Sequence, residues 1–242
     1  MTYISSILGS FLKLIYDMLV SVLPSEPESV SFYALAIIIA TIIIKAAVLP
    51  VNLHMIKSQK KMAELQPEIE KLKKKYKNDP QTMAVKQQQL FKDANYNALS
   101  GCLPMIIQMV VLIAFYRVFL SPEIYAFTDK VAFEAMNKNF FHMDSLSNVD
   151  TTLILPVLAA FTTFLTSYIT TKNPATQATQ NAQTKSMTTS MMIVMPVLIF
   201  WMSRNFQSAL TLYWTVSNTF TVIQQFITNK MIAKEVAEEL QQ

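Results

Sequence analysis

The stretch TIIIKAAVLP, residues 41–50, places one lysine inside an apolar run. The surrounding segment 32–53 is long enough to cross a bilayer core of about 30 Å at about 1.5 Å per residue. In such a helix Lys45 lies roughly 5 Å from the centre and about 10 Å from the nearer boundary. A central lysine costs about 2.5–3.5 kcal/mol in lipid, so the charge is expected to face water or polar groups. The alternative is a tilted helix whose lysine snorkels to the interface.

The composition indicates a membrane protein. Of the 242 residues, 52% are hydrophobic and 15% charged, and the mean hydropathy is +0.32. Glycine occurs only at Gly9 and Gly101, which excludes glycine-rich phosphate-binding loops. The single Cys102 and the two histidines, His54 and His142, form no cluster with metal-ligand spacing. We therefore expect no metal and no cofactor.

Five apolar segments predict an all-α polytopic membrane protein with five transmembrane helices. They lie at 32–53, 103–120, 152–171, 187–203 and 208–228. Before them, segment 1–31 carries apolar residues at helical spacing, which are Ile4, Leu8, Phe11, Ile15 and Leu19. This pattern predicts an external amphipathic helix in the membrane interface, with an uncleaved signal or a sixth span as alternatives.

The polar region 54–98 decides the orientation, because it holds ten lysines and five acidic residues. Positive charge favours the cytoplasm, which places the N-terminus outside and the C-terminus inside. The loop 121–151 is then external, and the linker 172–186 and the tail 229–242 are cytoplasmic. With this topology 14 of the 20 basic residues are cytoplasmic and five are external.

Region 54–98 is predicted to form a cytoplasmic helical hairpin. Asp79 is the expected N-cap of its second helix and Pro80 the first helical residue. The basic side chains are candidate contacts for a cytoplasmic partner, or simply a solvated run that sets the topology. The candidate contacts are Lys57, Lys60, Lys61, Lys71, Lys73, Lys74, Lys75 and Lys77.

Polar side chains recur at helical spacing in several of the predicted spans. Thr41 lies one turn before Lys45, the second span contributes Gln108, and the third carries Thr163 and Ser167. In the last span one stripe is predicted from Thr211, Trp214 or Thr215, Asn218, Thr221 and Gln225. Hydroxyl groups alone could be ordinary packing between helices. Together with a lysine and no acidic residue in the spans, they predict a polar hollow that attracts an anionic ligand.

Longer motifs resemble the YidC/Oxa/Alb family of membrane protein insertases over roughly residues 30–230. The similar segments are TIIIKAAVLPVNLHMIKSQKKMAELQPEIEKLKKKY, GCLPMIIQMVVLIAFYRVF, LPVLAAFTTFLTSY and LTLYWTVSNTFTVIQQFITNK. The resemblance implies a five-span bacterial cell-membrane protein with a hydrophilic groove that is closed toward the outside. It places Lys45 where the family has a single arginine, Thr41 at a matching hydroxyl, and Trp214 beside Tyr213 at a client-contacting aromatic position.

The expected function is therefore that of a membrane protein insertase, not an enzyme, acting alone or with the Sec translocon. Its partners would be nascent membrane proteins and lipid, with the ribosome or targeting factors at the hairpin. A solute or anion transporter, or a channel, that uses Lys45 is the alternative. The candidate groove residues are Lys45, Thr41, Gln108, Thr163, Ser167, Tyr213, Trp214, Asn218 and Gln225.

Overall fold

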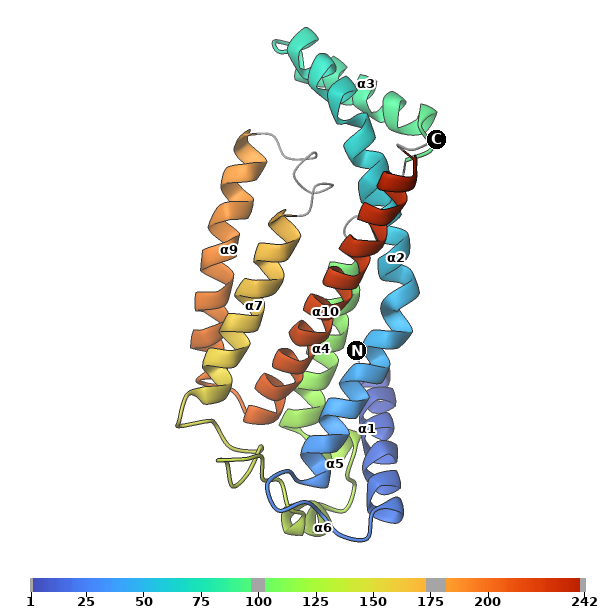
Figure 1. Ribbon diagram of the computed structural model, residues 1–242. Coiled ribbons are helices and arrows are strands. Elements are labelled where there is room, and N and C mark those ends of the chain that lie inside the picture. Colours follow the sequence, from blue (N-terminus) through green and yellow to red (C-terminus); the bar gives the residue numbers. More distant parts are fainter. Residues whose placement is uncertain (1, 97–102, 173–181, 240–242) are drawn as a thin grey trace.

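The computed structural model describes residues 2–96, 103–172 and 182–239, and within them all regular secondary structure is helical (Figure 1). The helices are α1 Thr2–Val22, α2 Phe32–Lys75, α3 Pro80–Asp93, α4 Leu103–Leu120, α5 Pro122–Tyr125, α6 Lys130–Ala135, α7 Ile154–Lys172, α9 Ala182–Ser203 and α10 Ser208–Glu239. Three isolated β-bridges lie around the loop between α6 and α7. The prediction of an all-α polytopic membrane protein is confirmed.

Helix α2 joins the first apolar segment and the first arm of the hairpin in one continuous element. Its N-cap is Ser31, whose hydroxyl accepts a hydrogen bond from the Ala34 amide at 3.1 Å. The helix continues through Pro50 and Pro67. At 1.5 Å per residue it is roughly 66 Å long, about twice the thickness of a bilayer core. One helix therefore carries both the lysine of the membrane segment and the charged arm beyond it.

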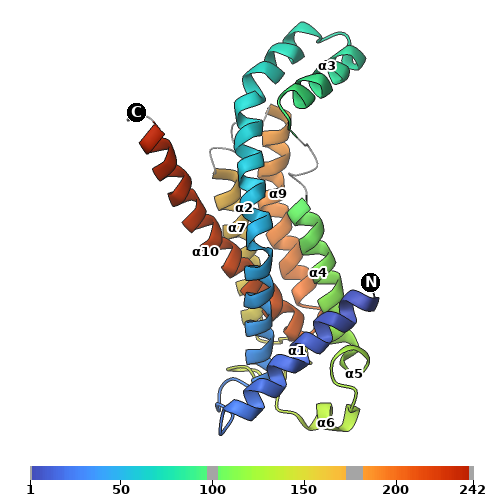
Figure 2. The same ribbon diagram turned by 90° about the vertical axis from the view of Figure 1, so that its right-hand side faces the viewer.

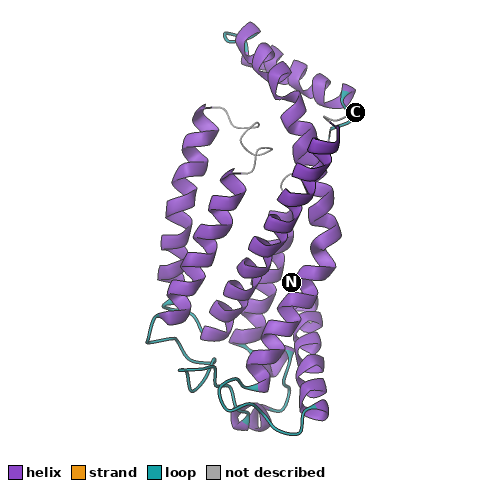
Figure 3. Cartoon of the chain, in the orientation of Figure 1, coloured by secondary structure: helices purple, strands orange, loops and turns teal. Residues whose placement is uncertain are grey.

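The second arm of the hairpin is α3, which begins as the sequence predicts. The Asp79 carboxylate accepts a hydrogen bond from the Thr82 amide at 3.0 Å, and Pro80 is the first helical residue. In Figure 3 this hairpin lies at one end of the molecule, whereas most of the loops gather at the other end.

By length and composition, three described helical segments can cross a membrane, namely Thr2–Val22, Phe32–Asn52 and Ile154–Thr171. Ile106–Leu120 and Met192–Ser203 are shorter apolar helices. Helix α7 packs between α9 and α10, and α10 packs in turn against α2. This arrangement brings α2, α4, α7 and α10 together around the candidate residues.

Helix α1 runs obliquely across α2 and α4 and also contacts α5 (Figure 2). Its buried face holds Ser5, Gly9, Leu12 and Ile15. The stripe predicted from the sequence largely faces this protein core, because Leu8, Phe11 and Leu19 pack against the same cluster. The outward face is apolar as well, and its exposed residues include Tyr3, Ile7, Leu14 and Met18. Helix α1 therefore carries apolar residues on both faces, whereas the predicted amphipathic helix has only one apolar face.

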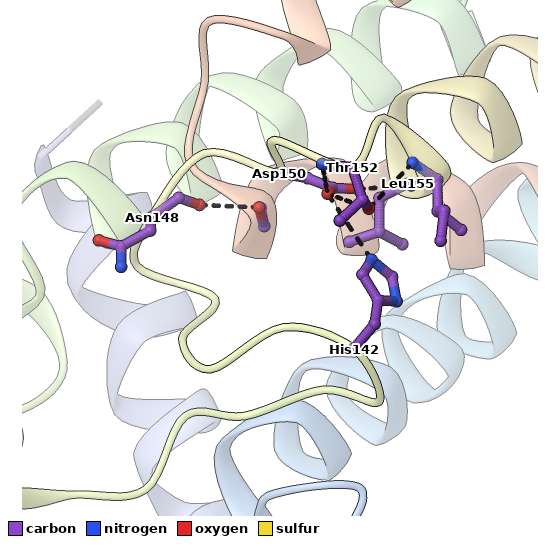
Figure 4. A network of polar contacts seen from close by, with 7 residues as sticks. His142, Asn148, Asp150, Thr152 and Leu155 are labelled. Carbon is purple, nitrogen blue, oxygen red and sulfur yellow. Dashed lines mark hydrogen bonds and ion pairs between the residues drawn. The ribbon is translucent and has the colours of Figure 1, made fainter.

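The loop between α6 and α7 ties the starts of α7 and α10 together (Figure 4). The buried Asp150 carboxylate accepts hydrogen bonds from the Thr152 amide at 2.8 Å and the Leu155 amide at 2.8 Å. His142 Nε2 lies 3.6 Å from the same carboxylate. The Asn148 carbonyl oxygen accepts from the Ser208 amide at 2.8 Å and from the Ser208 hydroxyl at 2.7 Å. We call Asp150, Asn148 and these partners the loop clasp.

Replacing Asp150 with asparagine should loosen the start of α7. Burial alone would raise the pKa of Asp150, but the hydrogen bonds from Thr152 and Leu155, with the nearby His142, lower it. The stabilisation is therefore complete above the ordinary value of 3.8 and is lost as the pH falls through the lower folded-state pKa. We expect Asp150→Asn to cost about 1–2 kcal/mol. Thermal unfolding in detergent from pH 7 to 3 measures this effect.

The matched control for that measurement is Asp144→Asn, because Asp144 is an exposed carboxylate of the same loop. It should leave both the unfolding temperature and its acid dependence unchanged. Equal unfolding curves for wild type and Asp150→Asn at every pH would contradict the prediction.

Candidate functional site

Lys45 is half-buried on α2 and bonds to two other helices. Its ammonium donates to Gln108 Oε1 on α4 at 2.8 Å and to Thr221 Oγ1 on α10 at 3.0 Å. Gln108 Nε2 lies 3.2 Å from the Tyr213 hydroxyl and 3.4 Å from the Ser217 hydroxyl, both of which accept from it. We call these five residues the lysine cluster. It joins α2, α4 and α10 through one positive charge.

The partners of Lys45 are neutral dipoles. The ion pairs in the described part of the chain join Lys13 to Asp17, Lys130 to Glu134 and His142 to Asp150, and none of them involves Lys45. An amide oxygen and a hydroxyl oxygen solvate an ammonium without neutralising it. The cluster therefore keeps a net positive charge within an apolar helix bundle.

A second set of polar residues joins α7 to α10, and we call it the Thr163 cluster. Thr163 is buried, and its hydroxyl accepts from Trp214 Nε1 at 2.9 Å and from Asn218 Nδ2 at 2.8 Å. Farther along the same seam, Gln225 Nε2 donates to the Thr170 hydroxyl at 2.8 Å. The predicted residues Thr163, Trp214 and Asn218 thus lie together, and Gln225 lies farther along the same pair of helices. The hydrogen bonds described for these four residues do not reach the lysine cluster.

Helix α10 therefore has two polar faces, and the single stripe predicted from the sequence was wrong. Tyr213, Ser217 and Thr221 recur every four residues and face α2 and α4. Trp214 and Asn218 face α7. The sequence reasoning missed Ser217, although its spacing of four from both Tyr213 and Thr221 is a usable signal.

Two predicted residues stand apart from both clusters. Thr41 is buried on α2, and its hydroxyl donates to the Ile37 carbonyl of its own helix at 2.6 Å. Ser167 is half-buried on α7, where its carbonyl oxygen accepts from the Thr171 hydroxyl at 2.8 Å. Asn52 extends the contact between α2 and α10 by donating to Gln224 Oε1 at 3.4 Å.

An apolar cavity of about 220 Å³ lies between α4, α9 and α10. Its walls include Leu112, Tyr116, Ile199, Leu210 and Trp214. Trp214 thus lines this apolar space with part of its ring while its indole nitrogen bonds to Thr163. The Trp214 indole therefore contacts the Thr163 cluster on one side and the apolar cavity on the other.

The lysines of the hairpin are mostly exposed. Among the predicted partner contacts, Lys61, Lys71, Lys74, Lys75 and Lys77 are exposed and Lys73 is half-buried. The side chains of Lys57 and Lys60 lie outside the described residues. A cleft of about 440 Å³ between α2 and α3 is lined by basic and acidic groups that include Lys71, Lys86 and Asp93. Within the described residues no group of three histidine, cysteine or acidic side chains is placed to hold a metal.

Comparison with known proteins adds an independent line of evidence. The sequence model of the family described as 60Kd inner membrane protein matches residues 27–235. The chain is 37% identical over 210 residues to the membrane protein insertase YidC of Clostridium perfringens, covering 87% of this chain and 84% of that protein. It is 40% identical over 214 residues to the YidC of Clostridium acetobutylicum, covering 88% and 80%. The YidC of Clostridium tetani is 31% identical over 239 residues, covering 99% of both chains.

Proposed function

This chain belongs to the 60Kd inner membrane protein family, and from that premise we propose that Lys45 receives acidic segments of the proteins it inserts. The chain is a bacterial membrane protein insertase, whose substrates are nascent membrane proteins and whose surroundings are lipid. In the proposed mechanism a hydrophilic client segment enters a polar groove from the cytoplasm while its apolar helix passes into lipid. No covalent chemistry is needed.

The observation that carries the proposal is a positive charge at membrane depth with neutral partners. Lys45 donates to an amide and a hydroxyl, and no described ion pair neutralises it. A charge in this position is costly unless water or an anion reaches it. A client carboxylate would gain a charge-assisted hydrogen bond there and lose it again on release. The membrane potential, about 2.3 kcal/mol per charge per 100 mV, would draw the negative segment outward.

The proposed topology has five spans, an external N-terminus and a cytoplasmic C-terminus, with α1 at the external interface. The hairpin and the described end of α10 lie at the same end of the molecule in Figure 1, which supports a common side for both. The loop clasp joins α7 and α10 at the opposite end, which supports a groove that is closed toward the outside.

The client helix would slide along exposed apolar faces of α2, α7 and α10. Ile43 on α2, Phe161 on α7 and Ile223 on α10 are each roughly half exposed. A client span can contact such side chains as readily as lipid tails do, because both are apolar. The proposed route therefore passes between the polar clusters and the bilayer without crossing a polar barrier.

Exposed lysines on α2 and α3 give the hairpin a surface for an acidic partner. We propose the Sec translocon, the ribosome or targeting factors as candidates, with anionic lipid headgroups as a competing ligand. A solvated run that only fixes the topology explains the same lysines.

Reconstitution tests the proposed function directly. Purified full-length protein in liposomes should insert a small single-span protein, measured by protease protection, while chloride and small neutral solutes stay trapped. Empty liposomes carrying the same lipids are the control. Solute or chloride flux without client insertion would support the alternative of a transporter or channel that uses Lys45.

A further inference from the structure

The side chains around Lys45 fix the direction of every hydrogen bond that reaches its ammonium. Gln108 has an oxygen that accepts and a nitrogen that donates twice. The oxygen lies 2.8 Å from the Lys45 ammonium, and the nitrogen lies within 3.4 Å of two hydroxyl oxygens. Turning the amide over would place N–H groups against the ammonium, donor against donor. The ammonium, which can only donate, therefore holds the amide oxygen toward Lys45, and the two hydroxyls accept from the amide nitrogen.

Both of those hydroxyls are fixed in the core. Tyr213 and Ser217 are almost completely buried. The Tyr213 ring also packs against Phe115, with ring centroids 4.7 Å apart. Buried, packed side chains have few alternative rotamers, so the acceptors for the Gln108 amide stay in place.

The Thr221 hydroxyl is also oriented to accept from Lys45, and its own helix fixes that orientation. Its hydroxyl donates to the Ser217 carbonyl at 2.9 Å, which uses its only hydrogen. The lone pairs of the oxygen are left to face Lys45, at 3.0 Å. Both acceptors of the ammonium are thus prevented from becoming donors.

We propose that Gln108 and Thr221 are positioning residues that hold the Lys45 ammonium with one N–H left for a single carboxylate oxygen of the client. An ammonium has three donors, and the described contacts use two of them. This inference rests on the proposed function and adds a specificity to it. The site would therefore recognise one acidic group of the client through a single charged hydrogen bond.

The test compares two clients that differ only in charge. One single-span client carries an acidic outer tail, and the other carries asparagine and glutamine in place of those acids. The selectivity ratio is the insertion rate of the first divided by that of the second, measured with full-length protein in liposomes. Gln108→Glu preserves shape but sets a carboxylate beside the ammonium, so we expect the ratio to fall roughly tenfold, toward one.

Tyr213→Phe is the milder variant, because it removes one acceptor of the Gln108 amide nitrogen and leaves the ring in place. We expect the ratio to fall about threefold. Thr221→Val should lower it similarly, whereas Thr219→Val is the matched control. Thr219 is exposed on the same helix and donates only to the Thr215 carbonyl, so its loss should leave the ratio unchanged.

Three results distinguish the positioning role of Gln108 and Thr221 from the electrostatic function of Lys45 on which it rests. An unchanged ratio in Gln108→Glu and Tyr213→Phe would overturn the positioning role and leave the proposed function standing. Equal slowing of both clients in these variants would also overturn it, because a merely structural role affects both alike. A wild-type ratio of one would instead refute the electrostatic function of Lys45 on which the inference rests.

Discussion

Replacing Lys45 with glutamate is expected to abolish insertion of clients with acidic outer tails, while clients with neutral tails are affected far less. Lys45→Ala should slow acidic-tailed clients at least tenfold, because a hydrogen bond to a charged group contributes about 1.5–3 kcal/mol. Glutamate adds repulsion to that loss. Lys45→Arg keeps the charge and should retain part of the activity, although its planar fork does not reproduce the two point contacts of the ammonium.

The measurement is the initial rate of client insertion into liposomes for each variant and each tail. Lys13→Gln serves as the charge control, since it removes one positive charge from a partly exposed side chain of α1, where the lysine is paired with Asp17. Wild-type insertion of acidic-tailed clients by Lys45→Ala would refute the electrostatic role. If Lys45→Arg also fails to insert clients of either tail type, the lysine has a packing role and not an electrostatic one.

The arrangement around Lys45 explains which sequence signals were informative. In the described spans most threonine hydroxyls donate to the carbonyl four residues earlier on their own helix, as Thr166, Thr215 and Thr219 do. A hydroxyl stripe therefore says little about contacts between helices. Side chains with donors that extend farther, such as Gln108 and Trp214, bond across to other helices.

The all-α class could be predicted from composition and periodicity, and so could the placing of Gln108 among the polar side chains of the spans. The division of α10 into two polar faces could not be predicted, because the rotation of one helix against four neighbours depends on tertiary packing. Ser217, which accepts from Gln108, lies on the face that the predicted stripe left out. Periodicity gives the faces of a helix, but only packing decides which neighbour each face contacts.

The continuity of α2 through Pro67 could not be predicted from the sequence either. A proline inside a helix removes one backbone hydrogen bond and often kinks or ends the helix. In the structure the helix continues to Lys75, and Ile69 is fully buried just beyond the proline. Burial of that apolar side chain, about 1.5–3 kcal/mol, offsets the lost bond.

Gly9 lies where α1 packs against Tyr125 of α5, a role that its place in the sequence does not reveal. Ser5 and Gly9 are spaced four apart on the buried face of α1, a small-residue pattern typical of tightly packed membrane helices. A Cβ atom on Gly9 would lie 2.1 Å from the Tyr125 carbonyl oxygen. Because that atom belongs to the backbone, it cannot move aside as the end of a flexible side chain would.

Gly9→Ala should therefore destabilise the protein, even though alanine favours a helix over glycine by about 1 kcal/mol. The clash forces α1 away from α5 and costs about 1–3 kcal/mol net, with more for Gly9→Leu. Thermal unfolding in detergent and proteolysis of the 23–31 connection report this displacement. Ser10→Ala is the matched control, since Ser10 is exposed on the next position of the same helix and should gain slightly in stability. Equal or higher stability of Gly9→Ala would mean that α1 does not press on α5 and would contradict the prediction.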